Sequence, residues 1–329
     1  MKSAPARWWT LLFSCALAAL LLWLLVRGLD LQAFRQALSS LSFPLALAAL
    51  GFLAAGYTTR IVRWWWMLKA LEPELNLAVC IWPFLTSIAL NNVLPFRVGD
   101  GLRIVGFRRE LRCPAVPLAG TLVVERLLDA VALCGFFFLG LLYLPSGVFP
   151  QPFIVAATVL AGASLGALLA LMVALPLLYR WSLSVQKRLQ GTSQRQRWLA
   201  AAWGQGLRLA ETLSLIGSAP RMLVLLALSG LCWGLEGGVF ATVAAALPLT
   251  CNLNPVAPWF SLATGTLATL LPSTPGYAGT FDYFAAQGLA VYGAPAEAAA
   301  AFALTVHGLL WAPLTGSGLV YLLVRGGRR

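Results

Sequence analysis

The sequence is poor in charge and has a single histidine. Only 10% of its 329 residues are Asp, Glu, Lys or Arg, whereas 60% are hydrophobic, and the mean hydropathy is strongly positive. Soluble domains carry about 25% charged residues, which they expose to water. The scarcity of charge therefore excludes an ordinary soluble domain and predicts a membrane protein.

Acidic residues are the rarer charged class. The chain has 11 Asp and Glu against 23 Lys and Arg, a formal net charge of +12. The basic residues lie beside apolar segments, which is typical of membrane topology and contacts with anionic lipid rather than nucleic-acid binding. Most of them are Arg, whose planar fork suits phosphate and carboxylate groups. We expect a membrane lipid, anionic or phosphate-bearing, as the partner, and no nucleic acid.

Catalytic and metal-binding patterns are absent as well. The six cysteines form no CxxC pair, and one histidine, His307, cannot build a metal site alone. There is no phosphate-binding loop, His-Glu-x-x-His or Gly-x-Ser-x-Gly pattern. We predict no metal and no cofactor, and the sequence supports no enzyme activity without excluding it. The cysteines are interpreted as small core residues and His307 as a hydrogen-bonded core histidine.

Long apolar runs predict an all-α polytopic membrane protein. A crossing helix needs about 20 apolar residues. Lys2 and Arg7 precede the first run, which we interpret as a retained span rather than a signal peptide. The predicted spans are 8–26, 43–66, 117–143, 152–178, 222–247 and 298–324.

Two further apolar stretches are interrupted. Residues 78–94 and 256–271 each run into a segment rich in Pro and Gly, followed by a second short arm. Neither arm is long enough to cross comfortably, so each stretch predicts a re-entrant helical hairpin. The predicted breakers are Pro95 and Gly99 in the first hairpin and Pro272, Pro275, Gly276 and Gly279 in the second.

Basic residues in the loops predict the topology. The segment 179–221 carries seven Lys and Arg, whereas the turns 144–151 and 248–256 carry none. Arg60, Arg63 and Lys69 are interpreted as marking the cytoplasmic end of the second span. The positive-inside rule then places both termini in the cytoplasm of a multi-pass protein of a bacterial inner membrane. The segment 179–221 is either a pair of amphipathic helices on that surface or a solvated connector.

The hairpins suggest an internal repeat. Each carries Leu-Pro-x-x-x-Gly, at 94–99 and 271–276, and each lies between two spans. Counting crossings makes the preceding spans antiparallel. We predict one transmembrane domain over 1–329, built from inverted repeats at about 43–143 and 222–324, an arrangement that transporters use to form a central site. The alternative is coincidence in a leucine-rich chain.

Charges within the apolar segments mark the candidate site, because each costs about 2.5–3.5 kcal/mol at the bilayer centre. Glu125 and Asp129 share a helix face, so they need cations opposite, and the nearest are Arg97 and Arg103. These pairs either bind an anionic headgroup or only pin the hairpin to the span. The predicted substrate-binding residues are Asn92, Arg97, Arg103 and Arg126, and the predicted coupling or charge-pairing residues are Asp100, Glu125, Asp129, Glu236 and Asp282.

Three motifs carry a family resemblance: Asn92-x-Leu-Pro-x-Arg-x-Gly-Asp-x-x-Arg103, Glu125-Arg-x-x-Asp129 and Pro272-x-x-Pro-Gly-x-x-Gly-x-Phe-Asp282. They resemble the flippase-like transmembrane family named for the membrane region of lysylphosphatidylglycerol synthase, the multiple peptide resistance factor, over about 10–325. Asp100 and Asp282 stand where many relatives are expected to have Glu. The chain ends at Arg329 without an aminoacyl-transfer domain, so lysyl-lipid synthesis is not expected of this stand-alone member.

The resemblance implies a lipid-handling membrane protein. In the two-domain synthases this region moves aminoacylated phospholipid between leaflets, and stand-alone relatives are tied to hopanoid, polyisoprenoid or glycolipid pathways. We therefore expect a translocase of an anionic or phosphate-bearing (glyco)lipid. An accessory protein or transferase of lipid-linked sugar, hopanoid or polyisoprenoid metabolism, and a small-solute or ion transporter, remain alternatives. A homo-oligomer or a lipid-biosynthesis enzyme is a further possible partner.

Overall fold

The computed structural model describes residues 4–27, 29–39, 42–94, 97–188, 194–247, 253–270 and 274–326, and these ranges contain helices and turns but no strand. The chain is an all-α polytopic membrane protein, as predicted. The helices are α1 (Ala4–Val26), α2 (Leu31–Ser39), α3 (Phe43–Leu68), α4 (Leu77–Val93), α5 (Val98–Val105), α6 (Ala115–Leu141), α7 (Gln151–Arg188), α8 (Gln194–Ile216), α9 (Ala219–Ala246), α10 (Ala257–Ala268), η2 (Pro275–Tyr277), α11 (Thr280–Ala290) and α12 (Ala296–Gly326).

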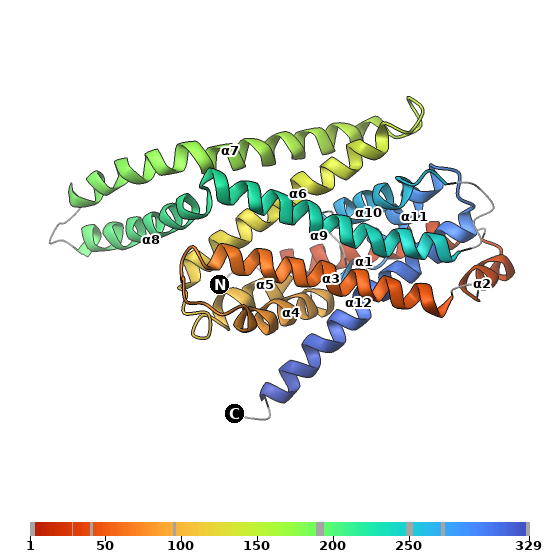
Figure 1. The fold of residues 1–329 in the computed structure, drawn as a ribbon, viewed down its shortest axis with the longest axis horizontal. Coiled ribbons are helices and arrows are strands. Elements are labelled where there is room, and N and C mark those ends of the chain that lie inside the picture. Colours follow the sequence, from red (N-terminus) through yellow and green to blue (C-terminus); the bar gives the residue numbers. More distant parts are fainter. Residues whose placement is uncertain are drawn as a thin grey trace.

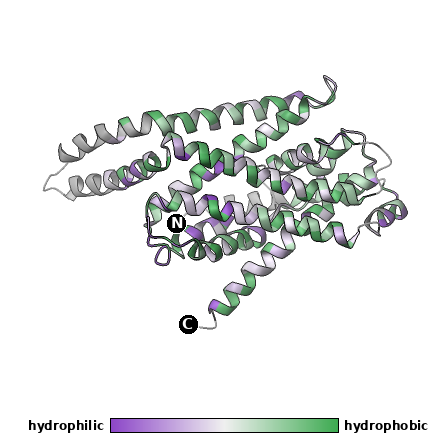
Figure 2. Cartoon of the chain, viewed as in Figure 1, coloured by the Kyte–Doolittle hydropathy of each residue, from purple (hydrophilic) through white to green (hydrophobic). Residues whose placement is uncertain are grey.

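Each of the six predicted spans contains a long helix, although 117–143 and 222–247 extend one or two residues past the helix end. Among the described residues, four helices are both long and apolar enough to cross a bilayer: α3, α7 up to Val173, α9, and α12 up to Arg325. Helix α6 has 27 residues and a length of about 40 Å at 1.5 Å per residue, but it carries three charged side chains near its middle. Because these charges lie far from both ends of α6, they need partners inside the protein. Figure 2 shows hydrophobic residues along most of the long helices.

Helices α3 and α9 lie side by side at the centre and run in opposite directions (Figure 1). Small residues allow them to approach closely, as is usual for helices in lipid. A Cβ atom on Gly238 of α9 would lie 2.6 Å from the ring of Phe52 on α3, closer than packed side chains allow. The antiparallel orientation is the one that the crossing count predicts.

Two helical hairpins flank this central pair. Helix α4 packs on α5, and α10 packs on α11. Helices α5, α10 and α11 have 8, 12 and 11 residues, too few to cross a bilayer. A Cβ atom on Gly99 would lie only 1.9 Å from the carbonyl oxygen of Ser87, so glycine is required where α5 meets α4. The predicted breakers Pro95 and Pro272 lie outside the described residues.

The tips of the hairpins adopt backbone conformations that helices do not allow. Arg97 has φ 52°, in the left-handed region, just before α5 begins. Gly276 and Gly279 have φ 70° and 82°, which glycine adopts without strain. These residues end one arm of each hairpin and start the next.

The four helices α3 to α6 and the four helices α9 to α12 make equivalent contacts. Replacing each helix of one set by its counterpart in the other turns one observed contact into another. Helix α4 packs on α12 as α10 packs on α6, and α5 packs on α6 as α11 packs on α12. The pairs α3 with α6 and α9 with α12 exchange in the same way. This exchange supports the inverted repeats at about 43–143 and 222–324, which stay a proposal.

The segment 179–221, predicted as a linker, differs from that description at its start. Helix α7 continues without a break to Arg188, and α8 packs back on α7 and on α6. Figure 1 shows these two helices extending beyond the bundle. The side chains of 180–202, which include Trp181 and Trp198, lie outside those described, so the amphipathic prediction remains untested.

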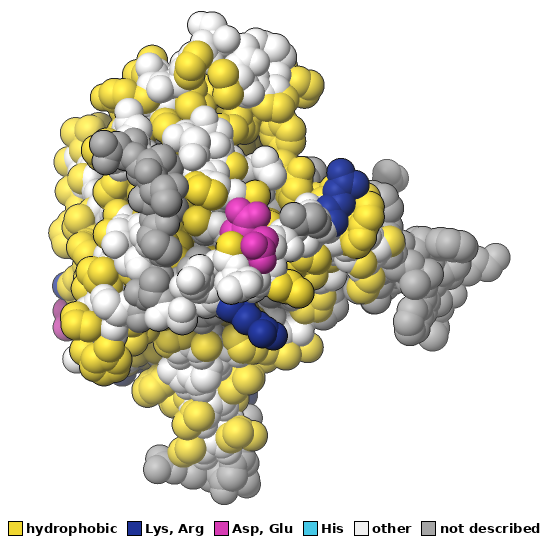
Figure 3. Space-filling model, turned by 90° about the vertical axis from the view of Figure 1, so that its right-hand side faces the viewer, with side chains coloured by type: hydrophobic (Ala, Val, Ile, Leu, Met, Phe, Trp, Pro, Cys, Tyr) yellow, Lys and Arg dark blue, Asp and Glu magenta, His cyan; other side chains and the backbone are white. Residues whose placement is uncertain are grey.

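The face drawn in Figure 3 is largely hydrophobic or uncharged, with a few scattered charged side chains. Four cysteines, Cys80, Cys113, Cys134 and Cys232, are buried and free, as predicted for core residues, whereas Cys15 is exposed.

Candidate functional site

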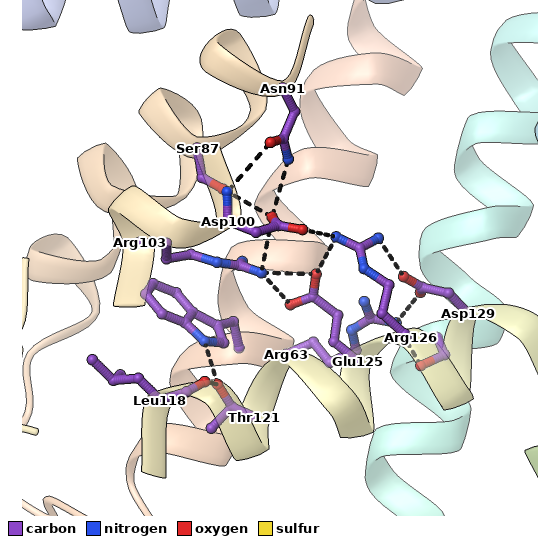
Figure 4. A network of polar contacts seen from close by, with 12 residues as sticks. Arg63, Ser87, Asn91, Asp100, Arg103, Leu118, Thr121, Glu125, Arg126 and Asp129 are labelled. Atoms are coloured by element: carbon purple, nitrogen blue, oxygen red, sulfur yellow. Dashed lines mark hydrogen bonds and ion pairs between the residues drawn. The ribbon is translucent and has the colours of Figure 1, made fainter. Parts of the chain in front are cut away.

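The first hairpin is tied to α6 by a buried ion pair. The Nη2 group of Arg103 donates to both carboxylate oxygens of Glu125, at 3.1 and 3.2 Å (Figure 4). The guanidinium carbon of Arg103 lies 4.8 Å from the ring centre of Trp64 and 4.9 Å from that of Phe84. Aromatic faces attract a cation, which compensates for the two nitrogens of Arg103 that have no hydrogen-bond partner among the described residues. The predicted Arg103–Glu125 pairing is present.

Asp100, in the first turn of α5, contacts both α4 and α6. Its Oδ1 atom accepts hydrogen bonds from Ser87 Oγ at 3.2 Å and Asn91 Nδ2 at 3.0 Å, both on α4. Its Oδ2 atom lies 3.2 Å from Nη2 of Arg126 on α6. Asp100 therefore joins both arms of the hairpin to the adjacent span (Figure 4).

Asp129 pairs with a cation that the sequence analysis assigned elsewhere. Its Oδ1 atom lies 2.7 Å from Nη1 of Arg63 on α3 and accepts a hydrogen bond of 3.0 Å from the indole N–H of Trp233 on α9. Nη1 of Arg63 also donates to Ser229 Oγ at 2.7 Å. Three helices are thus joined at one carboxylate.

Glu236 has the second cation of α3 as its partner. Its Oε2 atom lies 2.6 Å from Nη2 of Arg60, whose guanidinium carbon lies 4.1 Å from the ring centre of Trp233. Pairing with an arginine, one of the two roles that the sequence left open for Glu236, is therefore present, and the coupling role stays a prediction.

Arg60 and Arg63, which the sequence analysis interpreted as marking the cytoplasmic end of the second span, are not in a loop. They are only 7% and 1% exposed, inside the bundle. They are three residues apart and share one face of α3, and Asp129 and Glu236 needed cations within the spans. The three-residue spacing of the arginines and the lack of assigned cations for Asp129 and Glu236 were the available signals. Arginines near the end of an apolar run are equally typical of the end of a span, so the sequence did not decide between the two.

Arg97 and Arg126 differ from the buried, paired arginines Arg60, Arg63 and Arg103. The side chain of Arg126 is 41% exposed and lies 3.2 Å, 3.7 Å and 3.8 Å from carboxylate oxygens of Asp100, Glu125 and Asp129. Arg97 forms no ion pair with any residue that the structure describes, and its guanidinium carbon lies 6.0 Å from the ring centre of Tyr277. The predicted pairing of Arg97 with the acidic face of α6 is therefore absent.

A cavity of about 180 Å³ lies between the hairpin tips and the central helices. The arginines that line it outnumber the carboxylates by one. The charged lining residues are Arg60, Arg97, Arg126, Asp129 and Glu236. An apolar groove of about 380 Å³ between α3, α4 and α12 shares Tyr57 with this cavity.

The second hairpin places a further pair beside the cavity. Nδ1 of His307 lies 2.7 Å from Oδ1 of Asp282, and Nε2 lies 2.9 Å from the carbonyl oxygen of Gly276. The Oδ2 atom of Asp282 accepts from the backbone N–H of Gly279 at 2.8 Å, which caps α11. His307 is hydrogen-bonded, as predicted, but its pairing with Asp282 was not predicted.

Asn92 lies at the first hairpin tip. Its Nδ2 group donates to Thr315 Oγ1 at 3.0 Å, and its carbonyl oxygen accepts from the indole N–H of Trp311 at 3.4 Å. The structure therefore brings all the predicted binding residues except Arg103 to the cavity wall, while Arg103 lies behind it. No group of three His, Cys, Asp or Glu side chains suited to a metal ion occurs in the described ranges.

Comparison with protein families identifies the chain's relatives. The family model described as the lysylphosphatidylglycerol synthase TM region matches residues 11–318, a range that includes every charged residue of the cavity and its supporting pairs. No curated protein matches the chain.

Proposed function

Because the chain belongs to the family of the lysylphosphatidylglycerol synthase TM region, which indicates a lipid-related membrane protein, we propose that it translocates an anionic or phosphate-bearing (glyco)lipid between the leaflets of a bacterial inner membrane. The lipid headgroup would occupy the cavity between the hairpin tips, and its hydrocarbon chains would stay in the bilayer.

The unequal charge of the cavity carries this proposal. If its arginines served only to pin helices together, each would be matched by a carboxylate, because an unmatched charge away from water is costly. Arg60 is matched by Glu236, but Arg97 has no ion pair among the described residues, and Arg126 remains partly exposed. An anionic headgroup would supply the missing negative charge and receive the planar donors of arginine.

The apolar groove favours a lipid over a small polar solute. Its lining, including Leu53, Ile61, Leu85 and Leu314, is mostly hydrocarbon. Since Tyr57 borders both the groove and the charged cavity, a molecule with a polar head and an apolar chain matches both at once.

The arrangement of hairpins suggests how two leaflets would be reached. Short helices that end near the middle of a bundle leave backbone groups and charges there, which is how many transporters form a central site between inverted repeats. The two hairpin tips meet at the cavity, so movement of one repeat against the other would expose it to either leaflet in turn.

Basic residues at one end of the bundle support the proposed orientation. Lys69 directly follows α3, Arg109 lies in the turn after α5, and Arg325 lies in the last turn of α12 and pairs with Glu110 of the turn after α5. The pairing places the end of α12 and this turn together. The positive-inside rule then assigns both, with the C-terminus, to the cytoplasm.

Leaflet exchange in reconstituted vesicles tests the proposed function. Fluorescent phosphatidylglycerol serves as the anionic probe and fluorescent phosphatidylcholine as the zwitterionic one. We expect the protein to accelerate exchange of phosphatidylglycerol, and R97A and R126A to reduce that acceleration by about tenfold, the effect of losing one charge-assisted contact. The matched control is R109A, which removes an exposed arginine far from the cavity wall. Unchanged exchange of both probes in R97A and R126A would contradict the proposed mechanism.

A further inference from the structure

Helix α12 carries three polar side chains on one face, spaced four residues apart: His307, Trp311 and Thr315. His307 contacts the second hairpin tip through the carbonyl oxygen of Gly276. Trp311 and Thr315 contact the first tip through the backbone carbonyl and side-chain amide of Asn92. One face of α12 therefore holds both tips.

The two tips also touch each other. A Cβ atom on Gly276 would lie 3.0 Å from the carbonyl oxygen of Asn92 and 3.0 Å from Nε1 of Trp311. On the far side of this junction lies an open groove of about 530 Å³, and it shares four lining residues with the charged cavity: Asn92, Gly276, His307 and Trp311. These four residues are the wall between the cavity and the groove.

Next to an ionised Asp282, His307 can donate both of its hydrogen bonds only when both ring nitrogens carry a proton. Both ring nitrogens face acceptors: a carboxylate oxygen of Asp282 on one side and the Gly276 carbonyl oxygen on the other. A neutral imidazole has only one N–H, so it satisfies one of the two contacts, whereas an imidazolium satisfies both. The other oxygen of Asp282 is already occupied by the N–H of Gly279.

We propose that His307, oriented by Asp282, is a proton-binding site, and that the bound proton keeps the two hairpin tips closed over the cavity. When the proton leaves to water, one ring nitrogen presents a lone pair to an acceptor, and the contact with Gly276 or with Asp282 is lost. The junction then opens. This proposal builds on the proposed function, since it makes access of the lipid headgroup to the cavity depend on proton binding.

His307 is suited to this role because it is the only histidine in the chain, and histidine is the side chain whose ordinary range of titration lies between about pH 5 and pH 8.

Asp282 is the only described charged residue of α11, and α4 and α10 have none. Tyr277 of η2 is the neighbouring titratable group at the tip. The other titratable or charged groups that line the cavity with His307 are Arg97 of the first tip, Arg126 and Asp129 of α6, Glu236 of α9, and Tyr57 and Arg60 of α3. Of the remaining helices packed on α11 and α12, α2 carries an exposed Arg35, and α1 is followed by an exposed Arg27.

The protonation state is measured directly, without a variant, by labelling histidine with ¹⁵N in the full chain in lipid nanodiscs. One residue gives two ring signals. We expect both nitrogens to be protonated at about pH 6 and one to lose its proton as the pH rises toward about 8. A neutral ring throughout this range would overturn the proposal, and so would a doubly protonated ring that does not change.

The gate is measured with a cysteine reporter in the cavity. Thr269 lines the cavity, and its hydroxyl donates to the carbonyl oxygen of Thr266 in the same helical turn. T269C is placed in a chain in which Cys15 and Cys251 are serine, and its labelling by a water-soluble maleimide is compared with that in the same chain carrying H307Q. Comparing the two proteins at each pH cancels the pH dependence of the thiol itself.

We expect labelling to be about tenfold slower in the histidine protein than in H307Q at about pH 6, and nearly equal at about pH 8, the effect of one charge-assisted hydrogen bond. T315V, which loosens the first tip without removing a titrating group, is the control and should keep the pH dependence. Equal labelling of the histidine and H307Q proteins at low pH would overturn the gate. Neither measurement involves lipid exchange, so failure here leaves the translocase proposal standing, and failure of the exchange assay leaves this one standing.

Discussion

Arg60 and Glu236 join the two antiparallel helices at the centre of the fold, with 2.6 Å between Nη2 of the arginine and Oε2 of the glutamate. Both side chains are only 9% exposed. The pair lies at the cavity wall, so the same contact supports the helix packing and sets the charge of the site.

Removing one member of this pair should destabilise the protein more than removing both. E236Q leaves the Arg60 guanidinium buried without its counter-charge, and we expect the free energy of unfolding to fall by about 3–5 kcal/mol. The double variant R60M/E236L should recover most of this loss, because an apolar pair has no charge to desolvate. Thermal unfolding in detergent micelles gives the comparison, with E74Q, at an exposed turn position, as control. A double variant less stable than either single one would contradict the argument.

Gly99 should be irreplaceable while Gly101, two residues away, should not. An alanine Cβ at 99 would lie 1.9 Å from the carbonyl oxygen of Ser87 and 2.8 Å from Oδ1 of Asn91, whereas one at 101 meets nothing within 4 Å. We expect G99A to lower the free energy of unfolding by about 3 kcal/mol or more through overpacking, and G101A to leave it nearly unchanged. Yield of monodisperse protein and thermal unfolding measure both. Equal behaviour of the two variants would show that the hairpin does not close as described.

Gly276 should be sensitive for a different reason. It has φ 70°, and an added Cβ would press on Asn92 of the other hairpin tip. We expect G276A to lower the free energy of unfolding by about 1–3 kcal/mol because it combines backbone strain with a close contact. The control is G308A in the middle of α12, where nothing lies within 4 Å and alanine should stabilise the helix by about 0.5–1 kcal/mol. The prediction fails if G276A unfolds at the same temperature as the parent protein.

Arg103 should not tolerate lysine. Its guanidinium lies between the rings of Trp64 and Phe84 and donates to Glu125. A lysine ammonium lacks the planar surface that stacks on aromatic rings, so we expect R103K to lose about 1–3 kcal/mol of unfolding free energy. Substitution of exposed Arg109 by lysine is the matched control. Indistinguishable unfolding curves for R103K and R109K would remove the stacking argument.

Local pattern determined the secondary structure well. The predicted span 43–66 appears as α3 over Phe43–Leu68, and the predicted arm 78–94 appears as α4 over Leu77–Val93. Apolar runs are continuous in sequence, and a helix satisfies its own backbone hydrogen bonds, so both ends follow from nearby residues. The sequence also showed that α6 carries charged residues and that these residues need oppositely charged partners inside the protein.

The choice of partner was not available from sequence. Asp129 meets Arg63, 66 residues away, Glu236 meets Arg60, 176 residues away, and Asp282 meets His307 from another helix. Several arginines were within reach of each acid, and the rotation of each helix about its axis decides which of them turns inward.

By itself, the sequence determined that this chain is an all-α membrane protein with interrupted helices and buried charge, because composition and periodicity depend only on neighbouring residues. Only the tertiary structure decided that Arg97 is left without an ion pair among the described residues, that α12 holds both hairpin tips, and that Arg60 and Arg63 lie inside the bundle. Those outcomes depend on distances between segments far apart in the chain, which the packing of α3 against α9 and of the hairpins against α6 and α12 sets.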